Sequence, residues 1–134
     1  MSLELLKRYQ SEYGEFCKID VMNLDDRVKR VPAEKHHWVA RLIDHKILKD
    51  KLLKKKSHTK QGLIDGVVGK SPVSIGKTTL NEQLESAPSI EQLNEQIKEN
   101  DFVIEYLELV VKNVTFIAQD FKNIISTIQL EQGF

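Results

Sequence analysis

Basic side chains are concentrated in the middle of the chain, and their type and spacing suit a binding site for anions. The sequence has 134 residues and a formal net charge of zero. Residues 27–77 nevertheless carry fourteen basic and four acidic side chains, while the segments before and after them are acidic. A local surplus of this size attracts polyanions such as nucleic acids. The candidate DNA contacts are Arg41, Lys49, Lys54, Lys55, Lys56, Lys60, Lys70 and Lys77.

Two other interpretations of this basic segment stay open. Most charge runs are solvated helix surfaces, and an oligomeric structural or adaptor protein would use the same segment to dock an acidic protein partner. For a nucleic acid, we expect contacts to the backbone, because Trp38 is the only aromatic residue between Phe16 and Phe102 and stacking platforms are therefore scarce. No helix-turn-helix, zinc-finger or RNP motif predicts sequence-specific reading of a duplex.

Motifs that would indicate catalysis are incomplete. Residues 69–71 (Gly-Lys-Ser) and 76–78 (Gly-Lys-Thr) resemble the end of a phosphate-binding P-loop. Ile64 and Ser71 stand where that motif requires its first glycine, so neither segment predicts nucleotide hydrolysis. The four histidines have no metal-ligand spacing, and Cys17 has no neighbouring ligand. We therefore predict a protein that is not an enzyme and has neither a cofactor nor a metal.

Residues 89–130 predict one continuous helix. Two series of positions, each with a seven-residue period, are apolar throughout except at Asn100, and no glycine or proline interrupts them. Phe102, Leu109 and Phe116 widen the apolar surface beyond half the circumference, so the helix needs burial on two sides. We expect one side to pack on its own chain and the other on neighbouring subunits; the alternative is a core helix of a monomeric bundle. The predicted oligomerisation residues are Ile97, Ile104, Leu107, Val111, Val114, Phe121 and Ile125.

The first part of the chain predicts two shorter helices. Residues 3–13 have the pattern of an amphipathic helix, which Gly14 is expected to end. Residues 19–26 read as a linker with turn-forming residues. A second helix is expected to begin at Pro32, where a first helical turn tolerates proline. It continues to about Lys60, and its lysine-rich end is expected to project from the body of the protein.

Glycines mark the connection to the last third of the chain. Residues 62–76 contain four of the six glycines, which predicts a Gly-rich basic loop or hairpin. Thr79 is expected to cap a short helix and Ser89 to cap the long one. The fold class is therefore mainly all-α. Residues 1–77 are expected to form a helical DNA-binding region and residues 78–134 a helical oligomerisation region.

Cysteine content and hydropathy bear on the compartment. Cys17 is the single cysteine, which excludes an intrachain disulfide and fits a reducing environment. No charged-then-apolar leader and no membrane-length apolar run are present in the sequence. We therefore expect a soluble, intracellular protein.

The order and spacing of several short motifs resemble the UvsY-type recombination mediators of T-even-like phages. The matching segments are Ile19-Asp20, Asn23-Leu24-Asp25, Val31-Pro32, His36 through Trp38, Lys77-Thr78-Thr79-Leu80 and Leu84-Glu85-Ser86-Ala87. The segment 89–133 is similar in length and placement, so the resemblance covers nearly the whole chain. It implies a helical subunit that forms a closed ring through its C-terminal helix and binds single-stranded DNA.

The resemblance also implies a function in recombination. A protein of this kind helps to load a RecA-like recombinase onto DNA coated with single-strand-binding protein, here in the cytoplasm of the infected host cell. The family pattern has a Lys and an Arg two residues apart before an Asp and two aromatic residues, whereas residues 58–66 contain only Lys60 and no aromatic pair. The resemblance therefore moves the expected DNA contacts to the neighbouring lysines, which are Lys54, Lys55, Lys56, Lys70 and Lys77.

Overall fold

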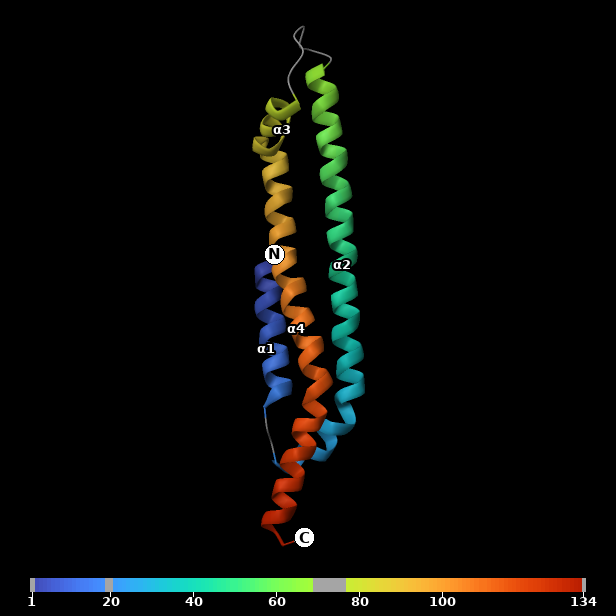
Figure 1. Ribbon diagram of the computed structural model, residues 1–134, viewed down its shortest axis with the longest axis vertical. Coiled ribbons are helices and arrows are strands. Elements are labelled where there is room, and N and C mark those ends of the chain that lie inside the picture. Colours follow the sequence, from blue (N-terminus) through green and yellow to red (C-terminus); the bar gives the residue numbers. More distant parts are fainter. Residues whose placement is uncertain (1, 19–20, 69–76, 134) are drawn as a thin grey trace.

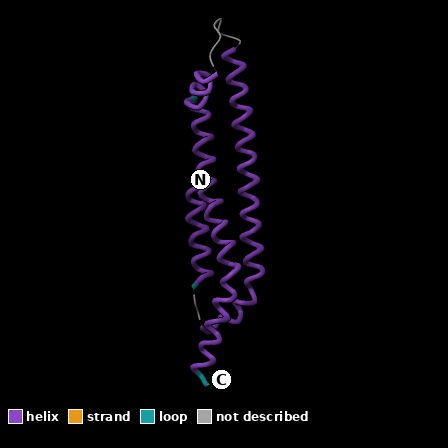
Figure 2. The backbone as a smooth tube through the Cα atoms, viewed as in Figure 1, coloured by secondary structure: helices purple, strands orange, loops and turns teal. Residues whose placement is uncertain are grey.

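Helices dominate the part of the chain that the structure describes. The computed structural model describes residues 2–18, 21–68 and 77–133. They form α1 (Ser2–Cys17), the 3-10 turn η1 (Val21–Asn23), α2 (Leu24–Val68), α3 (Lys77–Ser86) and α4 (Pro88–Glu131). Figure 2 shows no strand among these residues, so the mainly all-α class is confirmed. None of the described helices is long and apolar enough to cross a membrane.

Two long helices give the molecule the shape of a rod. α2 has 45 residues and α4 has 44 residues, and they run antiparallel and side by side (Figure 1). α1 packs along α4, and near the C-terminal end of α1 the Phe16 and Phe121 rings lie 6.3 Å apart. The short helix α3 precedes α4 and lies beside the lysine-rich end of α2 (Figure 1).

The core follows a seven-residue period on both long helices. The buried side chains that recur at this interval are Leu24, Val31, Trp38 and His45 on α2, and Asn100, Leu107, Val114 and Phe121 on α4. This period keeps two helices in contact over many turns. The rings of Tyr9 and Tyr13 on α1 pack edge-on against the fully buried Trp38, with centroid distances of 5.9 and 5.7 Å. The core therefore contains side chains from both predicted regions.

The predicted boundaries of the first two helices are wrong. α1 continues past Gly14 to Cys17, because Phe16 extends its apolar face onto α4. α2 begins at Leu24, well before Pro32, and the burial of Leu24 to 2% exposure stabilises this early start. Pro32 removes one helical hydrogen bond, and α2 changes direction near its N-terminal end (Figure 1), as expected for a helix that contains a proline.

The predicted loop or hairpin is wrong over residues 62–68, which belong to α2. Gly62 and Gly66 each disfavour a helix interior by about 1 kcal/mol relative to alanine. Leu63 and Ile64, which lie between them, are half-buried, and this burial outweighs that preference. Within the lysine-rich end, Lys56 and Lys60 meet Glu85 of α3, so this part of α2 contacts its own chain and does not project freely. Residues 69–76, the remainder of the predicted loop, lie outside the described residues.

The predicted long helix is confirmed as α4, with a different N-cap. Ala87 occupies the cap position and makes no side-chain capping bond, while Pro88 opens the helix and Ser89 lies inside it. Proline suits this first position because its missing N–H would have no helical partner there. The helix ends at Glu131, before Gly133, whose φ of 81° is a conformation that favours glycine.

Candidate nucleic-acid interface

Arg41 lies in the contact between α1 and α2 rather than on an open binding surface. Its guanidinium donates a hydrogen bond to Glu12 at 2.6 Å and lies over the rings of Tyr9 and Trp38 at 4.5 and 4.9 Å. Burial raises the pKa of Glu12, but hydrogen bonds from Arg41 and His37 outweigh burial and leave that pKa below its usual value. Arg41 therefore holds α1 against α2, and Glu12 neutralises its charge.

Two lysines of α2 bridge to carboxylates of α4. Lys49 lies 2.9 Å from Asp101, and Lys46 lies 3.8 Å from Glu108. Both pairs are substantially exposed, so each adds little stability. The pair with Asp101 does, however, partly neutralise Lys49, one of the predicted DNA contacts.

Lys56 and Lys60 both lie close to one carboxylate, that of Glu85 near the end of α3. We call Glu85, Lys56, Lys60 and Asn94 the Glu85 cluster. Glu85 Oε1 lies 2.5 Å from Lys60 Nζ and 3.6 Å from Lys56 Nζ, while Asn94 Nδ2 donates to Oε2 at 2.9 Å. The hydrogen bonds from Lys60 and Asn94 and the charge of Lys56 lower the pKa of Glu85 to about 2. Lys56 and Lys60, two more of the predicted DNA contacts, are thus paired with a carboxylate of their own chain.

Four exposed basic side chains of α2 form a row on one face of the helix. This outer lysine row consists of Lys51, Lys54, Lys55 and His58. Their spacing of three, four and seven residues from Lys51 places them on one side of a helix. Lys54 lies 3.1 Å from Asp50, but its side chain stays 72% exposed. Lys51, Lys55 and His58 make no ion pair with any other described residue.

The structure therefore separates the eight predicted contacts. It brings Lys54 and Lys55 together on the outer lysine row and gives Lys56 and Lys60 to the Glu85 cluster. Lys70 lies outside the described residues, as does the side chain of Lys77 at the start of α3. Sequence reasoning missed Lys51 and His58, although the helical spacing of basic residues around Lys55 is a signal that could have found them.

The apolar residues of α4 divide between core and surface. The predicted oligomerisation residues that their own chain buries are Ile104, Leu107, Val114 and Phe121, and the half-buried ones are Ile97, Val111 and Ile125. The buried four stabilise the subunit itself, so they are poor candidates for an intersubunit contact. The surface of α4 instead carries an outer apolar row, seven residues apart, of Phe102, Leu109 and Phe116, which are 44, 54 and 60% exposed.

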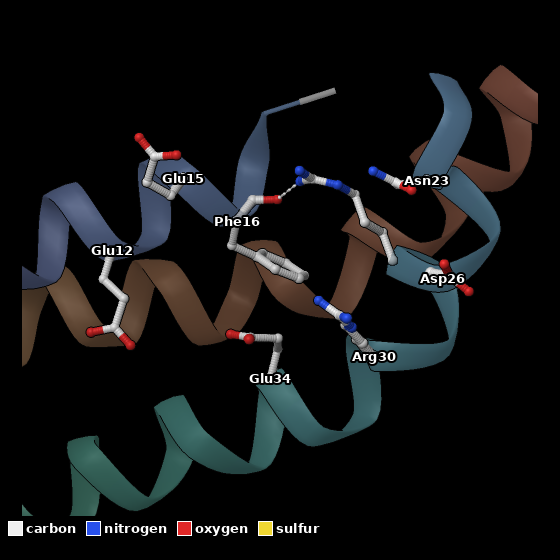
Figure 3. A pocket seen from close by; sticks show the side chains of 8 residues that line it. Glu12, Glu15, Phe16, Asn23, Asp26, Arg30 and Glu34 are labelled. Carbon is white, nitrogen blue, oxygen red and sulfur yellow. Dashed lines mark hydrogen bonds between the residues drawn. The ribbon is translucent and has the colours of Figure 1, made fainter. Parts of the chain in front are cut away.

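A pocket of about 380 Å³ lies where α1 meets the start of α2. Its labelled lining side chains in Figure 3 are Glu12, Glu15 and Phe16 from α1, and Asn23, Asp26, Arg30 and Glu34 from η1 and α2. Arg27, which also lines the pocket, donates a hydrogen bond to the backbone carbonyl of Phe16. Four carboxylates against two guanidinium groups make this an unsuitable site for a polyanion.

No group of three or more His, Cys, Asp or Glu residues in the described ranges has a geometry that could hold a metal ion. Among the described residues, the outer lysine row is the candidate nucleic-acid contact because its lysines are exposed and only Lys54 meets a carboxylate. No protein-family model, no curated protein and no solved structure matches the chain.

Proposed function

We propose that the protein is a single-stranded-DNA-binding recombination mediator whose subunits contact the DNA backbone through the outer lysine row. The observation that carries this proposal is that Lys51, Lys54 and Lys55 are exposed on one face of α2 and that only Lys54 has a carboxylate partner among the described residues. Lysines that meet phosphates release counterions, which favours binding. The lack of aromatic residues near the row favours contacts to the backbone over base stacking.

One subunit offers only a short contact. The row from Lys51 to His58 spans about 10 Å of helix axis at 1.5 Å per residue. A site of this length meets few phosphates and binds weakly at physiological salt. Assembly of several subunits repeats the site along one strand and raises the affinity by avidity.

The outer apolar row supports such an assembly, since Phe102, Leu109 and Phe116 form an exposed stripe on α4. In the proposed function the subunits close into a ring through this helix. The ring helps to load a RecA-like recombinase onto single-stranded DNA that is coated with single-strand-binding protein, in the cytoplasm of the infected host cell. The order of the motifs that resemble the UvsY-type mediators supports this assignment.

A second candidate is an oligomeric adaptor that docks an acidic protein partner. The pairing of Lys49 with Asp101 supports it, because lysines of α2 already bind helical carboxylates within this chain. An acidic helix placed on the outer lysine row would make contacts of the same kind. DNA binding distinguishes the two candidates.

The test is fluorescence anisotropy with a labelled oligothymidylate, titrated at several salt concentrations. The variant replaces Lys51, Lys54 and Lys55 with alanine, and the matched control replaces Lys98, Lys112 and Lys122, three exposed lysines of α4. If three phosphate contacts are lost, the slope of log K against log salt flattens by about 2, and the affinity falls about 100-fold at 0.1 M salt.

The control variant carries the same change in net charge, so it measures the general effect of charge. Equal losses in the two variants would show that the outer lysine row is not the DNA site. No binding by the wild-type protein would favour the adaptor.

A further inference from the structure

The Glu85 cluster has the donor arrangement of a phosphate site. Lys56 and Lys60 on α2 and Asn94 on α4 converge on one carboxylate, with nitrogen-to-oxygen distances of 3.6, 2.5 and 2.9 Å. The two lysine side chains are only 22 and 29% exposed, compared with 72% for Lys54. A carboxylate and a phosphodiester both present two acceptor oxygens and one negative charge to such donors.

We propose that Lys56, Lys60 and Asn94 form a second phosphate-binding site, and that Glu85 occupies it as an internal competitor until a DNA phosphate displaces its side chain. This inference rests on the proposed function, because the ligand is the backbone of the same strand. It adds a contact that lies on a different face of α2 from the outer lysine row. It also makes the affinity of the protein depend on an acidic residue.

Glu85 is placed so that it can leave without disrupting the fold. Leu84 beside it is buried to 4% exposure and anchors the end of α3. The Glu85 side chain itself is 46% exposed, so rotation of its side chain alone exposes Lys56 and Lys60. Because the Glu85 carboxylate is partly exposed, water and salt screen part of its attraction to the two lysines. A polyanion that brings many phosphates at once therefore competes effectively with this single carboxylate.

The alternative is that Glu85 only holds α2, α3 and α4 together. A purely structural clamp predicts that loss of the charge lowers stability and leaves DNA affinity unchanged. An internal competitor predicts a gain in affinity. The substitution Glu85→Gln tests this, because glutamine keeps the shape and an acceptor oxygen but removes the charge. Glu82→Gln is the matched control, since Glu82 is exposed on the same helix and has no ion pair with the described residues.

The experiment measures oligothymidylate binding by anisotropy for the two variants. Because Glu85→Gln removes the competing carboxylate, it should bind oligothymidylate more tightly than Glu82→Gln, by about fivefold at 0.1 M salt if the gain is comparable to one phosphate contact. The gain should disappear when Lys56→Ala and Lys60→Ala are added to Glu85→Gln. Equal affinities in Glu85→Gln and Glu82→Gln would overturn the proposal.

A second probe separates this result from failure of the proposed function. Tripolyphosphate carries the same phosphate oxygens without bases, and the side-chain amide of Asn94 reports its arrival by NMR. If no variant binds DNA, the proposed function fails, whereas a tripolyphosphate-dependent shift of the Asn94 amide that is larger in Glu85→Gln than in Glu82→Gln still supports the phosphate site. Equal shifts in the two variants would then reject the site as well.

Discussion

Replacing the buried Asn100 with leucine should destabilise the fold, although leucine is apolar and of similar size. The Asn100 amide donates to the backbone carbonyl of His45 at 3.0 Å and accepts from His45 Nδ1 at 2.8 Å. Because the amide nitrogen is used as a donor, the amide oxygen must be the acceptor, which assigns the ring proton to Nδ1. The other ring nitrogen, Nε2, then accepts from the Tyr9 hydroxyl at 3.1 Å. One polar chain thus joins α1, α2 and α4.

The size of the effect follows from what the substitution leaves behind. His45 is 7% exposed, so its Nδ1–H would remain buried without an acceptor, and such a group costs about 1–3 kcal/mol. The His45 carbonyl lies inside α2, so losing the hydrogen bond from the Asn100 amide costs less there. The added apolar surface of leucine offsets part of the total cost in stability. We expect Asn100→Leu to lower the free energy of unfolding by about 1–3 kcal/mol. Urea unfolding followed by circular dichroism, at one fixed subunit concentration, measures this.

The control removes the whole polar chain. Tyr9→Phe, His45→Leu and Asn100→Leu together leave no partner unsatisfied, and replacing both sides of a buried hydrogen bond by apolar groups can be nearly neutral. The triple variant should therefore be more stable than Asn100→Leu alone. The reasoning is refuted if Asn100→Leu is as stable as the wild type, or if the triple variant loses the sum of the three single effects.

Two further predictions concern charge and assembly. Because the pKa of Glu85 is lowered from 4.5 to about 2 in the folded protein, its ionised form stabilises the fold above pH 4.5, and this stabilisation is lost as the pH falls through about 2. In urea unfolding measured at several pH values, the loss of stability with falling pH should be smaller for Glu85→Gln than for the wild type, and identical pH profiles would contradict the prediction. Replacing Phe102, Leu109 and Phe116 with glutamine should shift sedimentation velocity to smaller species, because the exposed stripe would no longer be apolar; a wild-type protein that sediments as a monomer would disprove the assembly.

The sequence predicts α4 well because its pattern is complete. From Ile90 to Ile128 the positions that repeat every seven residues are apolar except at Asn100, and no glycine or proline interrupts them, so local preference and packing favour the same structure. α2 has the same seven-residue core period from Leu24 to His45. Sequence rules miss this period for two reasons. Pro32 lies inside it and is read as a helix start, and its last member, His45, is not apolar.

The candidate site was less predictable than the helices because charge pairing is a property of the folded chain. Lys60 and Glu85 are 25 positions apart in the sequence but 2.5 Å apart in the structure. Lys49 similarly meets Asp101 only because α2 and α4 are antiparallel. Counting lysines predicts that a basic segment exists. Which of its charges stay available depends on which faces of α2 the acidic helices cover.

This pairing has a consequence for the proposed assembly. The acidic α3 and α4 pair with Lys46, Lys49, Lys56 and Lys60 on the faces of α2 that they contact, so the outer lysine row remains on the opposite side. The outer apolar row lies on α4, a different helix, and also faces away from the core of its own chain. A second subunit that covers the apolar row therefore does not have to cover the lysines. In the proposed function, assembly and DNA binding would therefore use separate surfaces, and variants of each row should alter one property directly and the other only through avidity.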